Sequence, residues 1–187
     1  MAKLYFRYGA MGSSKTANLL MVRHNYIERN MRVVLLKPKI EDRDGATIIK
    51  SRIGLEAECQ YAEDFIENFS DITGNVDAII IDECQFLSEQ AIDFFAKIVD
   101  NYNIPVLCYG LRTDFTGKLF AGSKRLMELA DVIEEVPTVC WCGRRAHLNA
   151  RYNKAGIVRH GKQVELGAND RYIALCRKHF MEGNLGE

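Results

Sequence analysis

A phosphate-binding loop is predicted where the first apolar run of the chain ends. The pattern is a glycine, four residues, a small residue, then lysine and threonine. In such a loop the backbone N–H groups surround phosphate oxygens, the lysine adds a mobile positive charge, and the hydroxyl can bind Mg²⁺. The residues are Gly9, Ala10, Met11, Gly12, Ser13, Ser14, Lys15 and Thr16. A plain strand–turn–helix junction is the alternative interpretation.

Ser14 departs from the loop pattern, which has glycine at this position. Glycine there allows a positive φ and a close approach to phosphate. A positive φ costs serine about 1–2 kcal/mol. We therefore expect either a local conformation that serine accepts or a reduced affinity for nucleotide.

Two carboxylates follow a second apolar run, AIII, at Asp82 and Glu83. They fall at the expected carboxyl end of a buried strand, where ligands bind in parallel α/β sheets. Asp82 would hold Mg²⁺ directly or through water. Because neighbouring strand residues face opposite ways, Glu83 would point toward an acceptor hydroxyl and take its proton. A helix cap or a solvated strand end would explain either residue alone. With the loop, the pair predicts ATP dependence, but it does not name the acceptor, since an ATPase motor would also place an acid here.

Four candidate metal ligands lie near the end of the chain. Cys140 and Cys142 are separated by one residue, and Cys176 and His179 are three positions apart. Three cysteines and a histidine form a common structural zinc set, and a closed set leaves no position for catalysis. Buried thiols are the alternative, which suits two other cysteines, at positions 84 and 108, in or just after apolar runs.

Charged and aromatic side chains near predicted loops are less specific signals. Glu41, Asp42 and Arg43 could meet Mg²⁺ and phosphate, or form an ordinary polar loop, which is the commoner case. Four aromatic residues could stack on a base, although most such residues belong to the core. They are Phe86, Phe115, Phe120 and Tyr172.

A parallel sheet would bring these segments together. Strands are predicted at 3–8, 32–38, 76–83 and 104–111, and helices at 15–30, 62–69, 88–102 and 123–130, with a charged loop at 39–52. Buried strands that alternate with amphipathic helices predict an α/β fold with helices on both faces. After Pro137 the composition changes, so we predict a nucleotide-binding domain over 1–137 and a metal-binding subdomain with a β-ribbon around Lys154–Gly156 over 138–187.

The composition narrows the classes of partner. The 187 residues carry 25 basic and 25 acidic side chains, so no net charge attracts nucleic acid or an anionic membrane. No apolar stretch approaches the length of a membrane span, and the N-terminus begins on a strand pattern, with no sign of a secretion signal. We expect six reduced or metal-bound cysteines and a cytoplasmic location.

In number and order, these motifs resemble those of the type II thymidine kinases, the cellular and bacterial group with a zinc-bearing lasso domain. The resemblance runs almost end to end, on YGAMGSSKT, EDRDG followed by SRIG, IIIDECQFL, VLCYGLRTDF, CWCGRRA, GANDRY and CRKH. It implies a RecA-like P-loop sheet and a zinc ribbon whose loop closes over thymidine. It also implies transfer of the γ-phosphate of MgATP to the 5′-hydroxyl of deoxythymidine, feedback inhibition by dTTP and a homotetramer.

The resemblance also implies roles for matching residues. Glu83 would be the general base, with Asp82 and Gln85 beside it at the nucleotide site. The lasso would hold the base largely through backbone groups. Zinc would be bound by the Cys140–His179 set. The residues implied for the thymidine site are Met11, Phe86, Phe115, Val164, Gly167 and Tyr172. Glu41 stands where the family usually has aspartate before x-Arg, here Arg43.

Two other functions remain compatible with the residues. One is an ATP-driven nucleic-acid remodeller, in which zinc and Arg144, Arg145 and Arg151 grip a strand. The neutral charge and small size disfavour it. The other is a catalytically weak, nucleotide-binding regulator, which Ser14 and Glu41 leave open.

Overall fold

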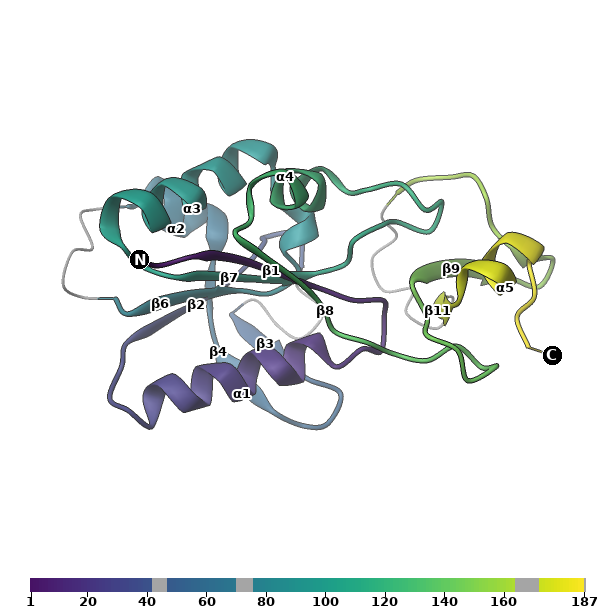
Figure 1. Cartoon of the computed structure of the whole chain (residues 1–187), viewed down its shortest axis with the longest axis horizontal. Coiled ribbons are helices and arrows are strands. Elements are labelled where there is room, and N and C mark those ends of the chain that lie inside the picture. Colours follow the sequence, from purple (N-terminus) through teal and green to yellow (C-terminus); the bar gives the residue numbers. More distant parts are fainter. Residues whose placement is uncertain (42–46, 70–75, 164–171, 187) are drawn as a thin grey trace.

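A six-stranded parallel sheet forms the larger part of the molecule (Figure 1). The computed structural model describes residues 1–41, 47–69, 76–163 and 172–186. The strand order is β5-β2-β6-β7-β1-β8, and every neighbouring pair is parallel. The strands are β1 (Leu4–Tyr8), β2 (Val33–Lys37), β5 (Gln60–Tyr61), β6 (Ala78–Ile81), β7 (Val106–Gly110) and β8 (Val132–Glu135).

Helices cover both faces of this sheet, as the sequence predicts. Helix α1 (Lys15–Ile27) lies on one face, and α2 (Ala62–Glu67), α3 (Glu89–Tyr102) and α4 (Ala121–Leu129) lie on the other (Figure 1). Alternate strand residues serve the two faces. In β7, Leu107 and Tyr109 pack in the cluster that contains α1, whereas Val106 and Cys108 pack in the cluster that contains α3. The strands therefore read as continuous apolar runs because both faces are buried.

A β-hairpin occupies part of the segment predicted as a charged loop. Strands β3 (Ile48–Lys50) and β4 (Glu56–Glu58) pair antiparallel. Ile49 is buried in the cluster that contains α1, and the Lys37 ammonium donates to the Ile48 carbonyl oxygen at 2.9 Å. The prediction of a continuous loop is therefore wrong from Ile48 onward, because tertiary contacts order these short strands.

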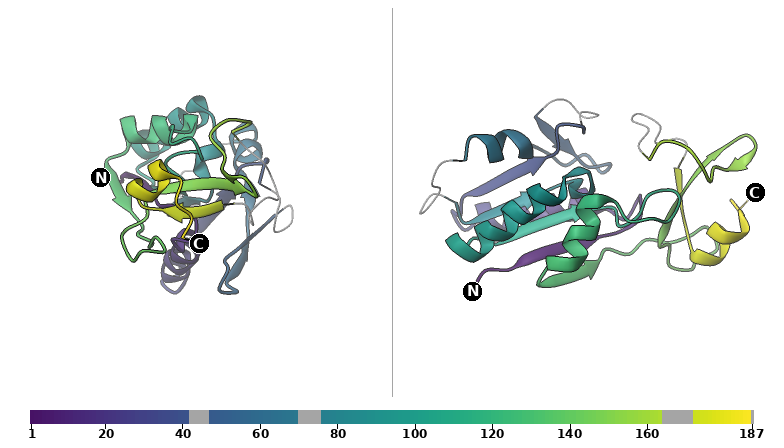
Figure 2. Two further views of the ribbon diagram at one scale, coloured as in Figure 1. Left: turned by 90° about the vertical axis from the view of Figure 1, so that its right-hand side faces the viewer. Right: turned by 90° about the horizontal axis from the view of Figure 1, so that it is seen from above.

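A second, smaller sheet lies beyond the carboxyl ends of the parallel strands (Figure 1, Figure 2). Its order is β10-β9-β11, with β9 (Leu148–Asn153), β10 (Gly156–Ile157) and β11 (Tyr172–Leu175), followed by α5 (Arg177–Glu182). The β9–β10 pair is the predicted ribbon. A separate buried cluster, which includes Cys140, Cys176 and Phe180, forms its core. Among the described residues, no helix has the length and apolar character needed to cross a membrane.

Candidate active site

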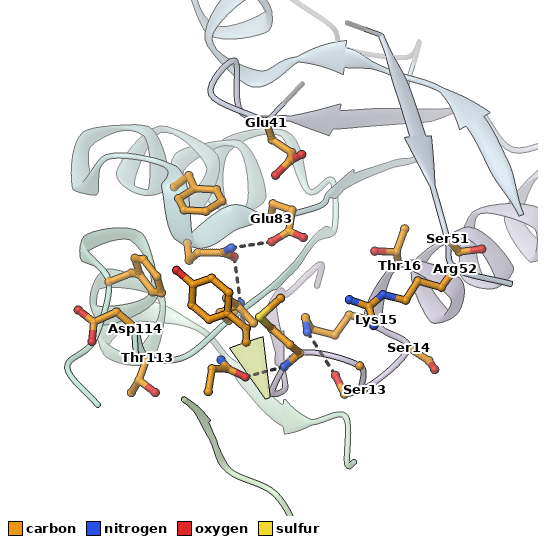
Figure 3. A pocket seen from close by; sticks show the side chains of 18 of the residues that line it. Ser13, Ser14, Lys15, Thr16, Glu41, Ser51, Arg52, Glu83, Thr113 and Asp114 are labelled. Carbon is orange, nitrogen blue, oxygen red and sulfur yellow. Dashed lines mark hydrogen bonds between the residues drawn. The ribbon is translucent and has the colours of Figure 1, made fainter. Parts of the chain in front are cut away.

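A cavity of about 270 Å³ opens where the two sheets face each other (Figure 3). Six parts of the chain line it: the loop before α1 with the start of that helix, Glu41 after β2, the β3–β4 hairpin, the turn after β6, the segment between β7 and α4, and the C-terminal part that contains the second sheet. The lining includes Met11, Ser13, Ser14, Lys15, Thr16, Glu41, Ser51, Arg52, Glu83, Gln85, Phe86, Phe115, Phe120, Asn149, Gln163 and Tyr172. Segments far apart in the sequence thus converge on one space of a size that suits a small molecule.

The loop before α1 wraps around the Lys15 ammonium. The ammonium donates to the carbonyl oxygens of Gly9 and Ala10 at 3.0 Å each and lies 3.3 Å from the Ser13 hydroxyl. Burial lowers the pKa of Lys15, and the negative charges of Glu83 and Asp82 oppose that shift. The loop therefore places a cation at the start of a helix, where phosphate is favoured.

Gly9 is required at its position by close packing. A Cβ atom there would collide with the Ser13 hydroxyl and with the carbonyl oxygen of Val136. The Gly9 N–H donates to the carbonyl oxygen of Gly110 at 3.2 Å, which ties the loop to the end of β7. The first glycine of the pattern therefore has a local physical reason.

Ser14 has a left-handed backbone, with φ 60° and ψ 27°, so the positive φ considered from the sequence is present. Its side chain makes no capping hydrogen bond. Because glycine removes this strain, Ser14→Gly should preserve or raise ATP affinity and stabilise the fold by up to about 1 kcal/mol. Calorimetric titration with ATP and urea unfolding measure the two effects. Ser14→Ala is the matched control, since it removes the hydroxyl but keeps the strain and should gain nothing. A large loss of ATP affinity in the glycine variant would show that the loop has another role.

Asp82 links the strand end to the loop. One carboxylate oxygen accepts from the Thr16 hydroxyl at 2.9 Å, and the other accepts from the Glu83 N–H at 3.0 Å. Burial and the nearby charge of Glu83 raise the pKa of Asp82 to about 7, against the effects of Thr16, the Glu83 N–H and Lys15. The positive charge near the buried Asp82 carboxylate is thus too small to keep its pKa at the usual value. A hydroxyl and a carboxylate are ligands that suit Mg²⁺, so these two residues fit that ion.

The backbone conformation that directs Glu83 into the cavity differs from the predicted extended strand. Strand β6 ends at Ile81, and Glu83 has a left-handed backbone with φ 49°, so the alternation argument is wrong for this residue. Gln85 orients its carboxylate: the Gln85 amide nitrogen donates to Glu83 at 2.6 Å, and its oxygen accepts from the Leu111 N–H at 2.9 Å. Because Gln85 is only 2% exposed, this arrangement is shielded from competing water.

Two glycines allow this turn to pack tightly. A Cβ atom at Gly110 would collide with the Gln85 amide oxygen and lie 2.8 Å from the Cys84 sulfur. A Cβ atom at Gly122 would lie 2.6 Å from the carbonyl oxygen of Cys84 and 2.7 Å from that of Leu87. The position of Glu83 is therefore set by β7 and α4 as well as by its own segment. Cys84 is fully buried, as predicted.

An aromatic region forms the other end of the cavity. The Phe86 ring meets the Phe120 ring edge-on, with centroids 5.7 Å apart. Phe115 is only 1% exposed, and the Arg151 guanidinium covers its ring at 3.6 Å. Tyr172 begins β11 and lines the cavity. The predicted Val164, Gly167 and Arg43 lie outside the described residues.

Sequence reasoning missed several residues of the cavity. Asn149 is 3% exposed, and its side-chain oxygen accepts from the Met11 N–H at 2.7 Å, across a separation of 138 positions. The Gln163 amide donates to Asp114 at 2.9 Å. Asn149 occupies a polar position of an alternating segment, a pattern that by itself indicates only a solvent-facing side chain. The rest are long-range contacts without a local pattern.

The predicted metal ligands come together beside the second sheet. One ligand atom each from Cys140, Cys142, Cys176 and His179 lies within 4.8 Å of the others. Burial raises the pKa of Cys140, but hydrogen bonds from the backbone N–H groups of Cys142 and Cys176 and from His179 outweigh it and lower the pKa to about 6. The indole ring of Trp141 stacks on His179, with centroids 4.3 Å apart. Thiolate and imidazole groups at these distances could hold a structural metal ion.

Comparisons with known proteins cover almost the whole chain. The family profile described as thymidine kinase matches residues 2–180. A thymidine kinase of Photobacterium profundum is 43% identical over 188 residues, which cover 97% of this chain and 98% of that protein. One of Zymomonas mobilis is 47% identical over 192 residues, 97% of each chain. One of Escherichia coli K12 is 43% identical over 97% of this chain and 92% of that protein.

Proposed function

The chain belongs to the thymidine kinase family, whose substrates are ATP and thymidine, and from that premise we propose that Glu83 is the general base of the transfer. The observation that carries the proposal is the position of its carboxylate. Held by Gln85, Glu83 lines the same cavity as Lys15 and Met11, so a triphosphate at the loop and a nucleoside at the aromatic end would meet beside it.

The loop before α1 and the acidic turn after β6 would bind the phosphates and Mg²⁺. Lys15 and the backbone N–H groups of the loop hold the β- and γ-phosphates, and Thr16 and Asp82 would hold Mg²⁺, with Glu41 at the same end of the cavity. That ion offsets negative charge on the phosphates when bound. Glu41 is only 6% exposed, and its place in the cavity supports such a role.

The transfer needs positioning more than strong base catalysis, because its transition state is loose. The 5′-oxygen of deoxythymidine forms a bond to the γ-phosphorus while the bond from that phosphorus to the bridging oxygen breaks. Glu83 orients the 5′-hydroxyl and accepts its proton late, and ADP leaves. The Gln85 amide keeps the carboxylate aimed at the hydroxyl.

The thymine would lie among the aromatic residues, between Met11, Phe86, Phe115 and Tyr172, which all line the cavity. In this proposal, backbone groups around Val164 and Gly167 also hold the base. Arg43 would contact phosphate at the other end. Feedback inhibition by dTTP would follow, because one molecule would occupy the nucleoside and phosphate regions together.

We further propose that the metal is zinc, since three thiolates and one imidazole match its preferred ligands. The ion would serve structure. A division into domains 1–137 and 138–187 is supported by the separate core clusters of the two sheets. We also propose that the protein forms a homotetramer and that it lies in the cytoplasm, where thiols stay reduced.

Steady-state assays with thymidine, deoxyuridine and deoxycytidine test the function. We expect ADP and dTMP to form in equal amounts, with kcat/KM for deoxycytidine at least about 10-fold lower, because its exocyclic amine changes the hydrogen-bonding edge. ATP hydrolysis stimulated by DNA without dTMP formation would instead indicate a nucleic-acid remodeller. Nucleotide binding with no turnover of any nucleoside would indicate a regulator.

A further inference from the structure

The turn of the β3–β4 hairpin carries Arg52, which has no role in the function proposed above. The turn is closed by its own hydrogen bonds. The Ser51 N–H donates to the Leu55 carbonyl oxygen at 2.7 Å, and the Ser51 hydroxyl accepts from the Leu55 N–H at 3.0 Å. The Gly54 N–H donates to the Ser51 carbonyl oxygen at 3.0 Å, with Gly54 at φ 89°. The backbone that carries Arg52 is therefore fixed within a compact turn.

The hairpin is also attached to the main sheet. Ile49 is 4% exposed against the α1 side of the core, and the Lys37 side chain, itself 2% exposed, donates to the Ile48 carbonyl oxygen. The Cys59 N–H donates to the Thr47 carbonyl oxygen at 2.8 Å, just beyond the paired strands. These contacts hold the turn at the mouth of the cavity.

The Arg52 side chain is directed into the cavity. It lines the cavity together with Lys15 and Thr16, and Figure 3 shows it extending from the hairpin toward Lys15. Burial is the main cause of the lowered pKa of Lys15, and the positive charge of Arg52 adds to that shift. The two cations are thus close enough to affect one another.

Within the parts of the chain that the structure describes, no carboxylate pairs with the Arg52 guanidinium. Its neighbour Lys50 differs, because it forms an ion pair with Glu56 at 3.2 Å. Lys15 and Arg52 repel each other, although Glu83 and Asp82 offset part of the positive charge at Lys15. A polyphosphate is the ligand class that relieves this repulsion, and the planar guanidinium can donate two parallel hydrogen bonds to its oxygens.

We propose that Arg52 binds the γ-phosphoryl group of ATP from the hairpin side of the cavity. The binding part stands on the geometry, and the catalytic part rests on the proposed function. While the 5′-oxygen bonds to the γ-phosphorus, the bridging bond breaks and the hydroxyl proton passes to Glu83. Arg52 keeps its protons throughout and donates to the γ-phosphoryl oxygens until ADP leaves. It therefore stabilises charge on the transferred group and makes no contact that ADP alone would need.

Binding of MgADP and of a non-hydrolysable MgATP analogue, measured by calorimetry, tests this contact. Arg52→Gln should weaken the analogue about 10-fold and change ADP affinity less than twofold, because only the analogue has a γ-phosphate. The same variant should lower kcat by about 10- to 1000-fold, as expected for a charge-stabilising arginine. Arg52→Lys should restore part of the analogue affinity, since it keeps the charge but not the fork.

Two controls separate this role from general effects. Arg29→Gln removes an exposed positive charge just beyond the far end of α1, and Glu56→Gln breaks the hairpin ion pair without touching Arg52. Both should leave the two affinities unchanged. Equal loss of ADP and analogue binding in Arg52→Gln, or no loss of either, would overturn the proposal. If the wild-type enzyme bound the analogue but did not phosphorylate thymidine, the proposed function would fail while the binding comparison still decided the role of Arg52.

Discussion

Replacement of Glu83 by glutamine should lower kcat by about 10²- to 10⁴-fold and leave ATP affinity close to that of the wild type. Glutamine has the shape of glutamate but accepts no proton from the 5′-hydroxyl. Its amide oxygen can still accept from the Gln85 amide, so the left-handed turn after β6 should persist. The phosphates would still be held by the loop around Lys15, which this change does not touch.

The measurement is a pair of assays, steady-state turnover with saturating thymidine and calorimetric titration with MgATP. Asp82→Asn is the matched control, because it also removes one carboxylate charge from the same turn. Asp82 bonds to Thr16 at the phosphate end, so its variant should weaken MgATP binding, whereas Glu83→Gln should reduce turnover alone. Equal turnover in Glu83→Gln and the wild type would remove Glu83 from the mechanism.

The backbone form of the loop proposed to bind phosphate could be predicted because its spacing is local. Lys15 and Thr16 must begin a helix directly after a turn to face one phosphate chain, and this requirement appears in consecutive residues. The conformation of Glu83 could not be predicted in the same way. The turn that follows its left-handed backbone packs closely against Gly110 and Gly122, which belong to other segments. A strand-alternation rule has no information about such packing.

The β3–β4 hairpin shows a second limit of sequence reasoning. Each strand has three residues, and in β3 only Ile49 is buried, so there is no period to detect. Its order comes from contacts with β2 and α1, which no local pattern encodes. The position of Arg52 at the cavity could therefore not be predicted, because the sequence of this segment is typical of a charged loop.

The grouping of the four candidate metal ligands was predictable for a chemical reason. Thiolate and imidazole side chains are uncommon enough that two pairs near one terminus indicate a shared ion, even with the tight Cys140–Cys142 spacing. The consequence for the cavity was not predictable. Asn149 and Gln163 bring the part of the chain with the candidate metal ligands into contact with Met11 and Asp114, and these pairings appear only in three dimensions.

Loss of one metal ligand, through Cys176→Ser, should unfold the second sheet and weaken thymidine binding more than ATP binding. The core beside the Cys140–His179 set is small, and two of its buried residues, Cys140 and Cys176, belong to that candidate set. Structural zinc contributes about 10–16 kcal/mol of apparent binding free energy in comparably small units, which exceeds what such a core supplies. Without the ion, the two remaining thiols and the His179 imidazole would lie close together with little to hold them.

The separation of the two affinities follows from which part of the chain each ligand would contact. Asn149 and Tyr172 reach the cavity from the second sheet, whereas Lys15, Thr16 and Asp82 belong to the parallel sheet and its loops. Zinc content, hydrogen exchange of residues 140–182 and calorimetric titration with each substrate measure the effects. Cys59→Ser is the control, because Cys59 lies in the core on the α1 side and should keep the metal. A Cys176→Ser protein with one bound zinc and wild-type thymidine affinity would contradict a structural role for this set, because the nucleoside end of the cavity would then be independent of the ion.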